Sequence, residues 1–190
     1  LDGRQLGNLA RLIFKQEELI HKALGIRDER LRRYARPIDP DFIARLEREH
    51  PRTREELGRL WYRGALQTTY RYHESRYHGV NLHSVWFRGT VEFRWAQGTL
   101  HAGRIKAFIQ FALSLVAQAA RQRAVSSRRR TYDPECAKYD FRVFLLRLGL
   151  IGPEFSTARR HLLALLPGDS AFKRGRPPRK SGSKKEEKSQ

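Results

Sequence analysis

The sequence predicts an α+β protein that is predominantly helical and has one antiparallel β-hairpin at about residues 81–96. Three observations support this prediction. Several segments repeat apolar residues at helical spacing, residues 90–95 alternate strictly, and Arg88-Gly89 separates them from a second strand-like run. The length of 190 residues suits one domain of moderate size or part of a larger one.

Residues that favour helix ends mark several of the predicted helices. Asp39-Pro40 opens one of them, because proline suits the first helical position. Thr53 and Glu56 fit a capping box, and Gly64 is the expected C-cap of the helix that follows. The predicted helices span residues 6–24, 40–49, 54–62, 102–123, 137–148 and 157–166.

The helix at 102–123 has the clearest amphipathic pattern. It follows Gly98-Thr99-Leu100 directly, so we expect its N-terminus to lie beside the end of the preceding strand, where it would favour an anion. Its predicted buried stripe consists of Ile105, Phe108, Ile109, Ala112, Leu115, Val116 and Ala119.

The hairpin is predicted to gather charged groups on one face. Successive strand side chains point to opposite faces, so Glu92 and Arg94 share the face opposite the apolar residues. A tight turn at Arg88-Gly89 would pair Val85 with Glu92 and His83 with Arg94. The polar face would then hold, within a patch about 10 Å across, Asn81, His83, Glu92 and Arg94.

Two interpretations of this polar face stay open on the residues alone. An acid and a strong cation held side by side can bind a metal ion or a phosphate. The alternative is a solvated face with a surface ion pair, which contributes about 0–1 kcal/mol.

The net charge of +19 makes nucleic acid or another acidic partner possible. Residues 173–190 supply six of these positive charges, and arginines far outnumber lysines, as a GC-rich genome can produce. Nucleic acid could bind through the basic linker Arg128-Arg129-Arg130 and the basic tail. A solvated connector is the alternative for the linker, and the tail at 172–190 is predicted to be disordered.

Composition excludes several other classes. Cys136 is the only cysteine, so no internal disulfide can form, and no Cys/His spacing suggests zinc. The longest apolar stretch, 107–120, is too short for a membrane span, and a cytoplasmic location is expected.

Because the chain begins with leucine and contains no methionine, we expect a fragment that lacks its N-terminal portion.

An ordered series of short motifs runs through the middle of the chain. It consists of Arg76-Tyr77, Asn81-Leu82, the TVEFR stretch at 90–94, Gly98-Thr99-Leu100 and the long helix. This order resembles the C-terminal part of the putative amidoligase family, which belongs to the carboxylate–amine ligase group with a glutamine-synthetase-like fold. Glu17-Glu18-Leu19 and Arg33-Tyr34 look similar to the preceding segment of that family, so the resemblance covers about residues 6–150.

The resemblance implies an ATP-dependent ligase that joins a carboxylate to an amine through an acyl phosphate. It implies Glu92 as a ligand of Mg²⁺ and Arg94 as a clamp on phosphate or acyl phosphate, with Arg76 as a second cationic contact. Asn81 and Thr99 are assigned to binding of the ATP cofactor. These residue types suit the chemistry, because magnesium and arginine stabilise the charge of phosphoryl oxygens.

One part of the family's metal site is missing from the sequence. A glutamine-synthetase-like site draws further carboxylates from earlier strands, and no strand with paired acidic residues precedes residue 80. We therefore expect residues 1–171 to be the C-terminal part of an amidoligase-like domain, inactive alone although its parent is an enzyme. The alternatives are a basic nucleic-acid-binding accessory protein without catalytic activity and a degenerate family member that serves as an interaction module.

Overall fold

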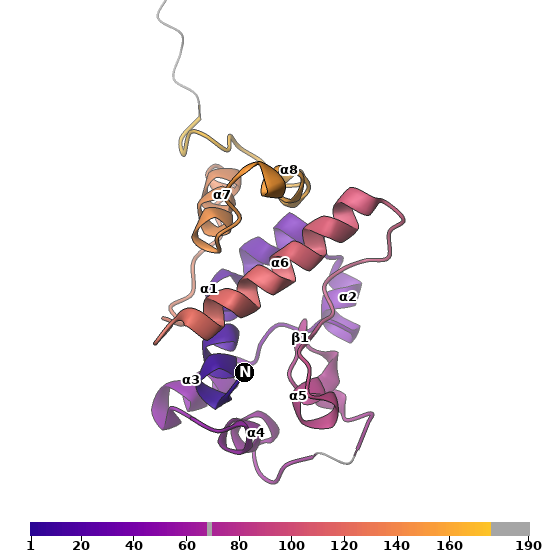
Figure 1. Cartoon of the computed structure of the whole chain (residues 1–190), viewed down its shortest axis with the longest axis vertical. Coiled ribbons are helices and arrows are strands. Elements are labelled where there is room, and N and C mark those ends of the chain that lie inside the picture. Colours follow the sequence, from indigo (N-terminus) through magenta and orange to yellow (C-terminus); the bar gives the residue numbers. More distant parts are fainter. Residues whose placement is uncertain (68–69, 176–190) are drawn as a thin grey trace, which may run out of the picture.

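The computed structural model describes residues 1–67 and 70–175, and it is mostly helical with one two-stranded antiparallel sheet (Figure 1). The prediction of an α+β protein rich in helix is thus confirmed. Most of the predicted tail lies outside the described residues. The helices and strands are α1 (Gly3–Leu24), α2 (Asp28–Arg33), α3 (Pro40–Glu49), α4 (Arg54–Tyr62), η1 (Glu74–Tyr77), β1 (Val80–Asn81), α5 (His83–Arg88), β2 (Glu92–Phe93), α6 (Ala102–Arg121), α7 (Ala137–Arg147), η2 (Pro153–Phe155) and α8 (Ser156–Leu163).

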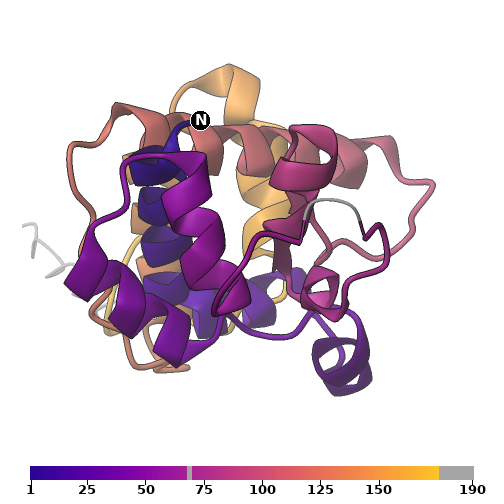
Figure 2. The same ribbon diagram turned by 90° about the horizontal axis from the view of Figure 1, so that it is seen from below.

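Helix α1 is the centre of the fold. It packs against α3 and α4 on one side and against α6, α7 and α8 on the others, as Figures 1 and 2 show from two directions. Nearly all of its length is buried, which is typical of a helix that is covered by neighbours all round. It ends at Gly25, whose φ of 62° is the left-handed conformation that glycine adopts without strain.

The local signals for helix ends were predicted well. Thr53 and Glu56 form the expected capping box, with Thr53 Oγ1 accepting from the Glu56 backbone amide at 3.1 Å. The expected C-cap at Gly64 is wrong by one residue, because Arg63 takes the left-handed position at φ 57°. The Arg63 guanidinium pairs with Asp39 at 2.7 Å.

The buried face of α6 differs from the predicted stripe. The buried residues recur at every fourth position, and Ile105 and Ile109 are 42% and 55% exposed. Phe111 packs edge-on against Phe141 and Phe144 of α7, and the same row contains two alanines. Small side chains allow helices to approach closely, so contact with α1 and α8 selects this row: Ala107, Phe111, Leu115 and Ala119.

The predicted hairpin is wrong between residues 82 and 89. Helix α5 lies between the two strands, and the register pairs Val80 with Phe93 and Asn81 with Glu92. The physical reason is burial of both Leu82 and Val85, which are 1% and 6% exposed. Residues three apart share a face in a helix but point to opposite faces in a strand. The predicted pairs of Val85 with Glu92 and of His83 with Arg94 therefore do not form.

A third segment extends the small sheet. The backbone of Arg36 bridges His78, and the Gly79 amide donates to the Arg36 carbonyl at 2.8 Å. On its other side, Gly79 accepts from the Arg94 amide at 2.8 Å. A Cβ at position 79 would lie 2.0 Å from Nε1 of the buried Trp95, so only glycine fits here.

Arginine side chains tie separate segments together by donating to backbone carbonyls. The clearest case is Arg30 of α2, which donates from Nε and Nη2 to the Arg94 carbonyl at 3.1 and 2.8 Å. It also donates to the Ala96 carbonyl at 3.2 Å, so α2 fixes the chain that leaves β2. The same type of bond is made by Arg4, Arg11, Arg36, Arg45, Arg54, Arg94 and Arg159.

No helix within residues 1–67 and 70–175 combines the length and the apolar character needed to cross a membrane.

Candidate functional site: an arginine-lined pocket

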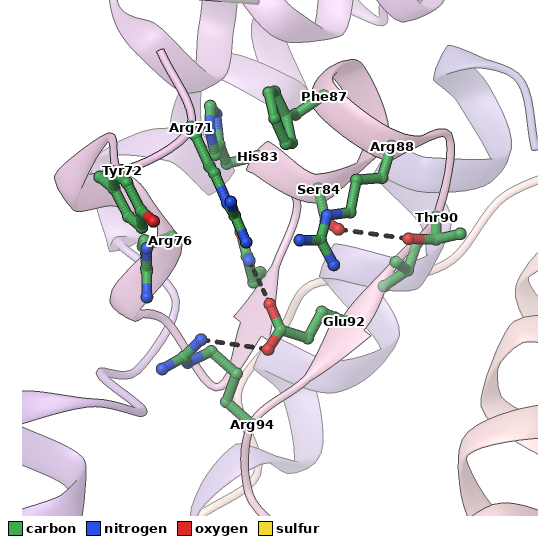
Figure 3. A pocket seen from close by; sticks show the side chains of 12 residues that line it. Arg71, Tyr72, Arg76, His83, Ser84, Phe87, Arg88, Thr90, Glu92 and Arg94 are labelled. Carbon is green, nitrogen blue, oxygen red and sulfur yellow. Dashed lines mark hydrogen bonds and ion pairs between the residues drawn. The ribbon is translucent and has the colours of Figure 1, made fainter.

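A pocket of about 390 Å³ opens beside the two-stranded sheet, between α5, β2 and the chain around η1 (Figure 3). Its position follows from the sheet register, because the pairing of Asn81 with Glu92 brings both residues into its lining. The pocket is lined by Arg71, Tyr72, Arg76, Asn81, His83, Ser84, Phe87, Arg88, Thr90, Val91, Glu92 and Arg94.

The Glu92 carboxylate is held by two partners. Its Oε2 accepts from Asn81 Nδ2 at 2.6 Å, and its Oε1 pairs with Arg94 Nη1 at 3.1 Å. Asn81 is 4% exposed and its Oδ1 has no hydrogen-bond partner among the described residues. Asn81 and Arg94 orient the carboxylate. The side chain of Glu92 is 46% exposed, so the carboxylate remains open to the pocket.

Three contacts fix the Arg94 side chain, and the first is its ion pair with Glu92. Its Nε donates to the Tyr34 carbonyl at 3.0 Å, and its guanidinium lies 5.5 Å from the centre of the Tyr77 ring. The Arg76 guanidinium lies 5.0 Å from the same ring and 5.1 Å from that of Tyr72. A cation over an aromatic face is stabilised without losing its charge. The tyrosines therefore position both arginines while leaving their charge available to a ligand.

His83 lies at the buried side of the pocket. Burial lowers the pKa of His83, and the neighbouring His73 lowers it further. Its Nδ1 lies 2.5 Å from the Tyr62 hydroxyl, whose pKa burial raises. The pKa shifts of both partners favour their uncharged forms, so this hydrogen bond adds no charge to the pocket.

The charge balance of the lining favours an anion. Figure 3 shows the guanidinium groups of Arg71, Arg76, Arg88 and Arg94 around the single carboxylate of Glu92. Arginine presents a planar fork of donors that matches the oxygens of carboxylate and phosphate. The pocket can thus hold a carboxylate, a phosphate or both, with Glu92 available to a positively charged or hydrogen-donating group.

The same residues supply little to a bare metal ion. Glu92 is one carboxylate, and the described residues contain no group of three His, Cys, Asp or Glu side chains that could hold a metal. Mg²⁺ often takes only one or two protein carboxylates when phosphate oxygens and water complete its shell. The pocket therefore fits magnesium that arrives with a polyphosphate, and not magnesium alone.

The structure brings most of the predicted site residues together. Arg76, Asn81, Glu92 and Arg94 line one pocket, and His83 joins them although the register that suggested it is wrong. Thr99 lies outside the pocket lining, where its hydroxyl accepts from the His101 amide at 3.2 Å.

The expected position of the α6 N-terminus is also wrong. His101 contacts His161 of α8 at a ring distance of 4.8 Å, so the first turn of α6 lies against α8 and not beside the pocket (Figure 1). The segment that follows Trp95 carries the chain across the molecule before the helix begins.

Sequence reasoning missed two of the four arginines. Arg71 belongs to a polar stretch with no periodic pattern, and Arg88 was assigned to the hairpin turn. The helix at His83–Arg88 is what brings Arg88 to the pocket. The polar, aromatic composition of residues 70–78 was the one available signal for Arg71.

The fold and this pocket define an α+β protein with a hollow lined by four arginines and one carboxylate. The family model described as putative amidoligase enzyme matches residues 1–116, which is more than half of the chain. The chain belongs to this family, and the resemblance seen in its motifs is confirmed. The match includes every residue of the pocket and ends within α6. Comparisons with curated proteins and with solved structures gave no match.

Proposed function

We propose that this protein serves an ATP-dependent ligation of a carboxylate to an amine, and that the arginine-lined pocket binds the anionic reactants. The observation that carries the proposal is the grouping of four arginines around one carboxylate, within the part of the chain that the amidoligase family model matches. A glutamine-synthetase-like arrangement of the complete catalytic domain is part of this proposal.

Each pocket residue has a role that follows from its contacts. Arg94 is the most firmly fixed cation, and it neutralises the oxygens of the carboxylate or phosphoryl group. Arg76 provides a second cation, which also lies against the Tyr77 ring. Glu92 orients Arg94 and offers an oxygen to magnesium or to the amine. Asn81 holds Glu92, whereas Thr99 does not line the pocket and has no role here.

ATP with Mg²⁺ would supply the phosphoryl group that activates the carboxylate for attack by the amine. The described residues offer one protein ligand to that metal, Glu92. The remaining ligands would be nucleotide phosphates, water, or protein groups beyond the described residues. The proposal thus concerns the activity of a whole catalytic domain.

We expect Arg94→Gln to lower kcat/KM for ligation by about 100-fold or more, the effect of losing one donor to a developing oxyanion. The assay uses the complete catalytic domain and measures ADP release with Mg²⁺ and ATP, over panels of amino acids and short peptides as carboxylates and of ammonia and primary amines as acceptors. Release must depend on both Mg²⁺ and the amine.

The matched control is Arg32→Gln, which removes an equal charge from an exposed position on α2. We expect this control to change the rate less than about twofold, since surface charges contribute little. Equal turnover by Arg94→Gln and wild type would contradict the site, and amine-independent ADP release would contradict the ligase class.

A further inference from the structure

A second hollow, of about 490 Å³, lies on another part of the molecule from the arginine-lined pocket. It is bounded by α1, by the segment that follows α6 and by α7, and much of it lies beyond the residues matched by the family model. The residues around it are Lys15, Gln16, Ser126, Arg128, Arg129, Arg130, Tyr139, Asp140, Val143, Arg147 and Lys173.

The lining carries a large excess of positive charge. Four arginines and two lysines surround the hollow, and Asp140 is its one carboxylate. Asp140 forms an ion pair with Arg130 at 3.0 Å. Within the described residues, no carboxylate pairs with Lys15, Arg128 or Arg147. Cations gathered around one hollow repel one another, and a bound anion would relieve that repulsion.

The basic segment at 128–130 is anchored to α1 and is not a free connector. The Arg130 amide donates to the Lys15 carbonyl at 3.0 Å. Arg129 pairs with the buried Glu17 at 3.1 Å and lies 4.4 Å from the centre of the Phe14 ring. These contacts fix the segment beside α1, so that it carries its basic side chains to one wall of the hollow.

A buried amide in the lining also lacks a partner. Gln16 is 5% exposed, and its Oε1 has no hydrogen-bond partner among the described residues. Leaving a buried acceptor unpaired costs about 1–3 kcal/mol. A hydroxyl group or a protonated phosphate oxygen in the hollow would satisfy it.

We propose that this hollow is a binding site for a compact polyphosphate anion, separate from the arginine-lined pocket. The cations surround a concavity and do not form a stripe along the surface, which favours a small ligand over an extended nucleic-acid backbone. Arg128, Arg147 and Lys15 bind the phosphate oxygens, and Gln16 accepts from a protonated oxygen or a hydroxyl of the ligand.

The test is calorimetric titration of the full chain with inorganic tripolyphosphate at low and at physiological salt. We expect saturable binding of one anion in this hollow. The double variant K15Q/R147Q should weaken it at least tenfold, and the single variant Arg128→Gln should weaken it severalfold. The matched control R32Q/K106Q removes the same charge from exposed positions and should change affinity less than twofold. Circular dichroism confirms that each variant is folded.

Three results would overturn this inference. Equal weakening by the control would show a general charge effect. Loss of binding in Arg94→Gln, with K15Q/R147Q unaffected, would place the anion in the arginine-lined pocket and leave the proposed ligase function standing. Binding of a single-stranded oligonucleotide that tripolyphosphate does not displace would identify nucleic acid as the occupant.

Discussion

Replacing Gly79 by alanine is expected to destabilise the protein by about 3 kcal/mol, at the upper end of the cost of overpacking a core. The new Cβ would lie 2.0 Å from Trp95 Nε1 and 2.7 Å from Cδ1 of the same ring. Trp95 is 3% exposed, so its ring can move only by displacing core neighbours or by entering a small adjacent cavity. Because the Gly79 carbonyl accepts from the Arg94 amide, the displacement would also reach the pocket.

Urea unfolding of the variant and of two controls measures this effect. Gly98→Ala places a Cβ where no atom lies within 4 Å, so we expect a change within about 0.5 kcal/mol. Adding Trp95→Ala to Gly79→Ala removes every ring atom near the new methyl group, so the two substitutions together should cost less than the sum of their separate effects. A Gly79→Ala variant as stable as Gly98→Ala would contradict the close packing of this sheet against Trp95.

The second large effect concerns Glu17 and His21, one turn apart on α1. Both side chains are buried, and they titrate in opposite directions. Burial raises the pKa of Glu17 from 4.5 to about 7, although the Ile38 amide and Arg129 both favour its ionised form. Burial lowers the pKa of His21 from 6.5 to about 4, helped by the charges of Arg129 and Lys22.

The two shifts have opposite effects on stability. Glu17 keeps its proton longer in the folded state, so its contribution is complete below pH 4.5 and is lost as pH rises to about 7. His21 takes up its proton more readily when unfolded, so its contribution is complete above pH 6.5 and is lost as pH falls to about 4. Between pH 4.5 and 6.5 the two slopes, each of up to about 1.4 kcal/mol per pH unit, nearly cancel.

We therefore expect each single variant to expose the slope of the other group. In Glu17→Gln the free energy of unfolding should rise by about 3 kcal/mol, relative to wild type, between pH 4.5 and 6.5. In His21→Gln it should fall by a similar amount. Chemical unfolding at several pH values checks this, with Glu18→Gln at the exposed neighbouring position as control. Parallel pH profiles for wild type and both variants would contradict the opposed titration.

The fold could be predicted from sequence where the signal was local. The capping box at Thr53 and the Asp39-Pro40 pair that opens α3 are chemical features of a few adjacent residues, and both appear as expected. The buried face of α6 could not be derived in this way. Apolar residues cover more than half of its circumference, and only the positions of α1 and α8 decide which row is covered.

The hairpin illustrates the limit of a strand pattern. Residues 90–95 alternate as strands do, yet β2 comprises only Glu92–Phe93, and its partner strand is equally short. The run before the turn is helical because Leu82 and Val85 both reach the core. Glu92, Arg94 and Asn81 could still be predicted as a group, since their motif order carries family information that does not depend on the register.

The bonds from arginines to backbone carbonyls bear on the meaning of the net charge. A guanidinium can reach across to another segment and donate several hydrogen bonds from one planar group, which an ammonium cannot do with the same geometry. Part of the excess positive charge therefore comes from arginines that stabilise the fold by bonding to backbone carbonyls of other segments. A protein in which lysine replaces these arginines would have the same electrophoretic behaviour and a looser fold. The arginines therefore affect two separate properties, the isoelectric point and the stability of the fold. Replacement by lysine would change only the second.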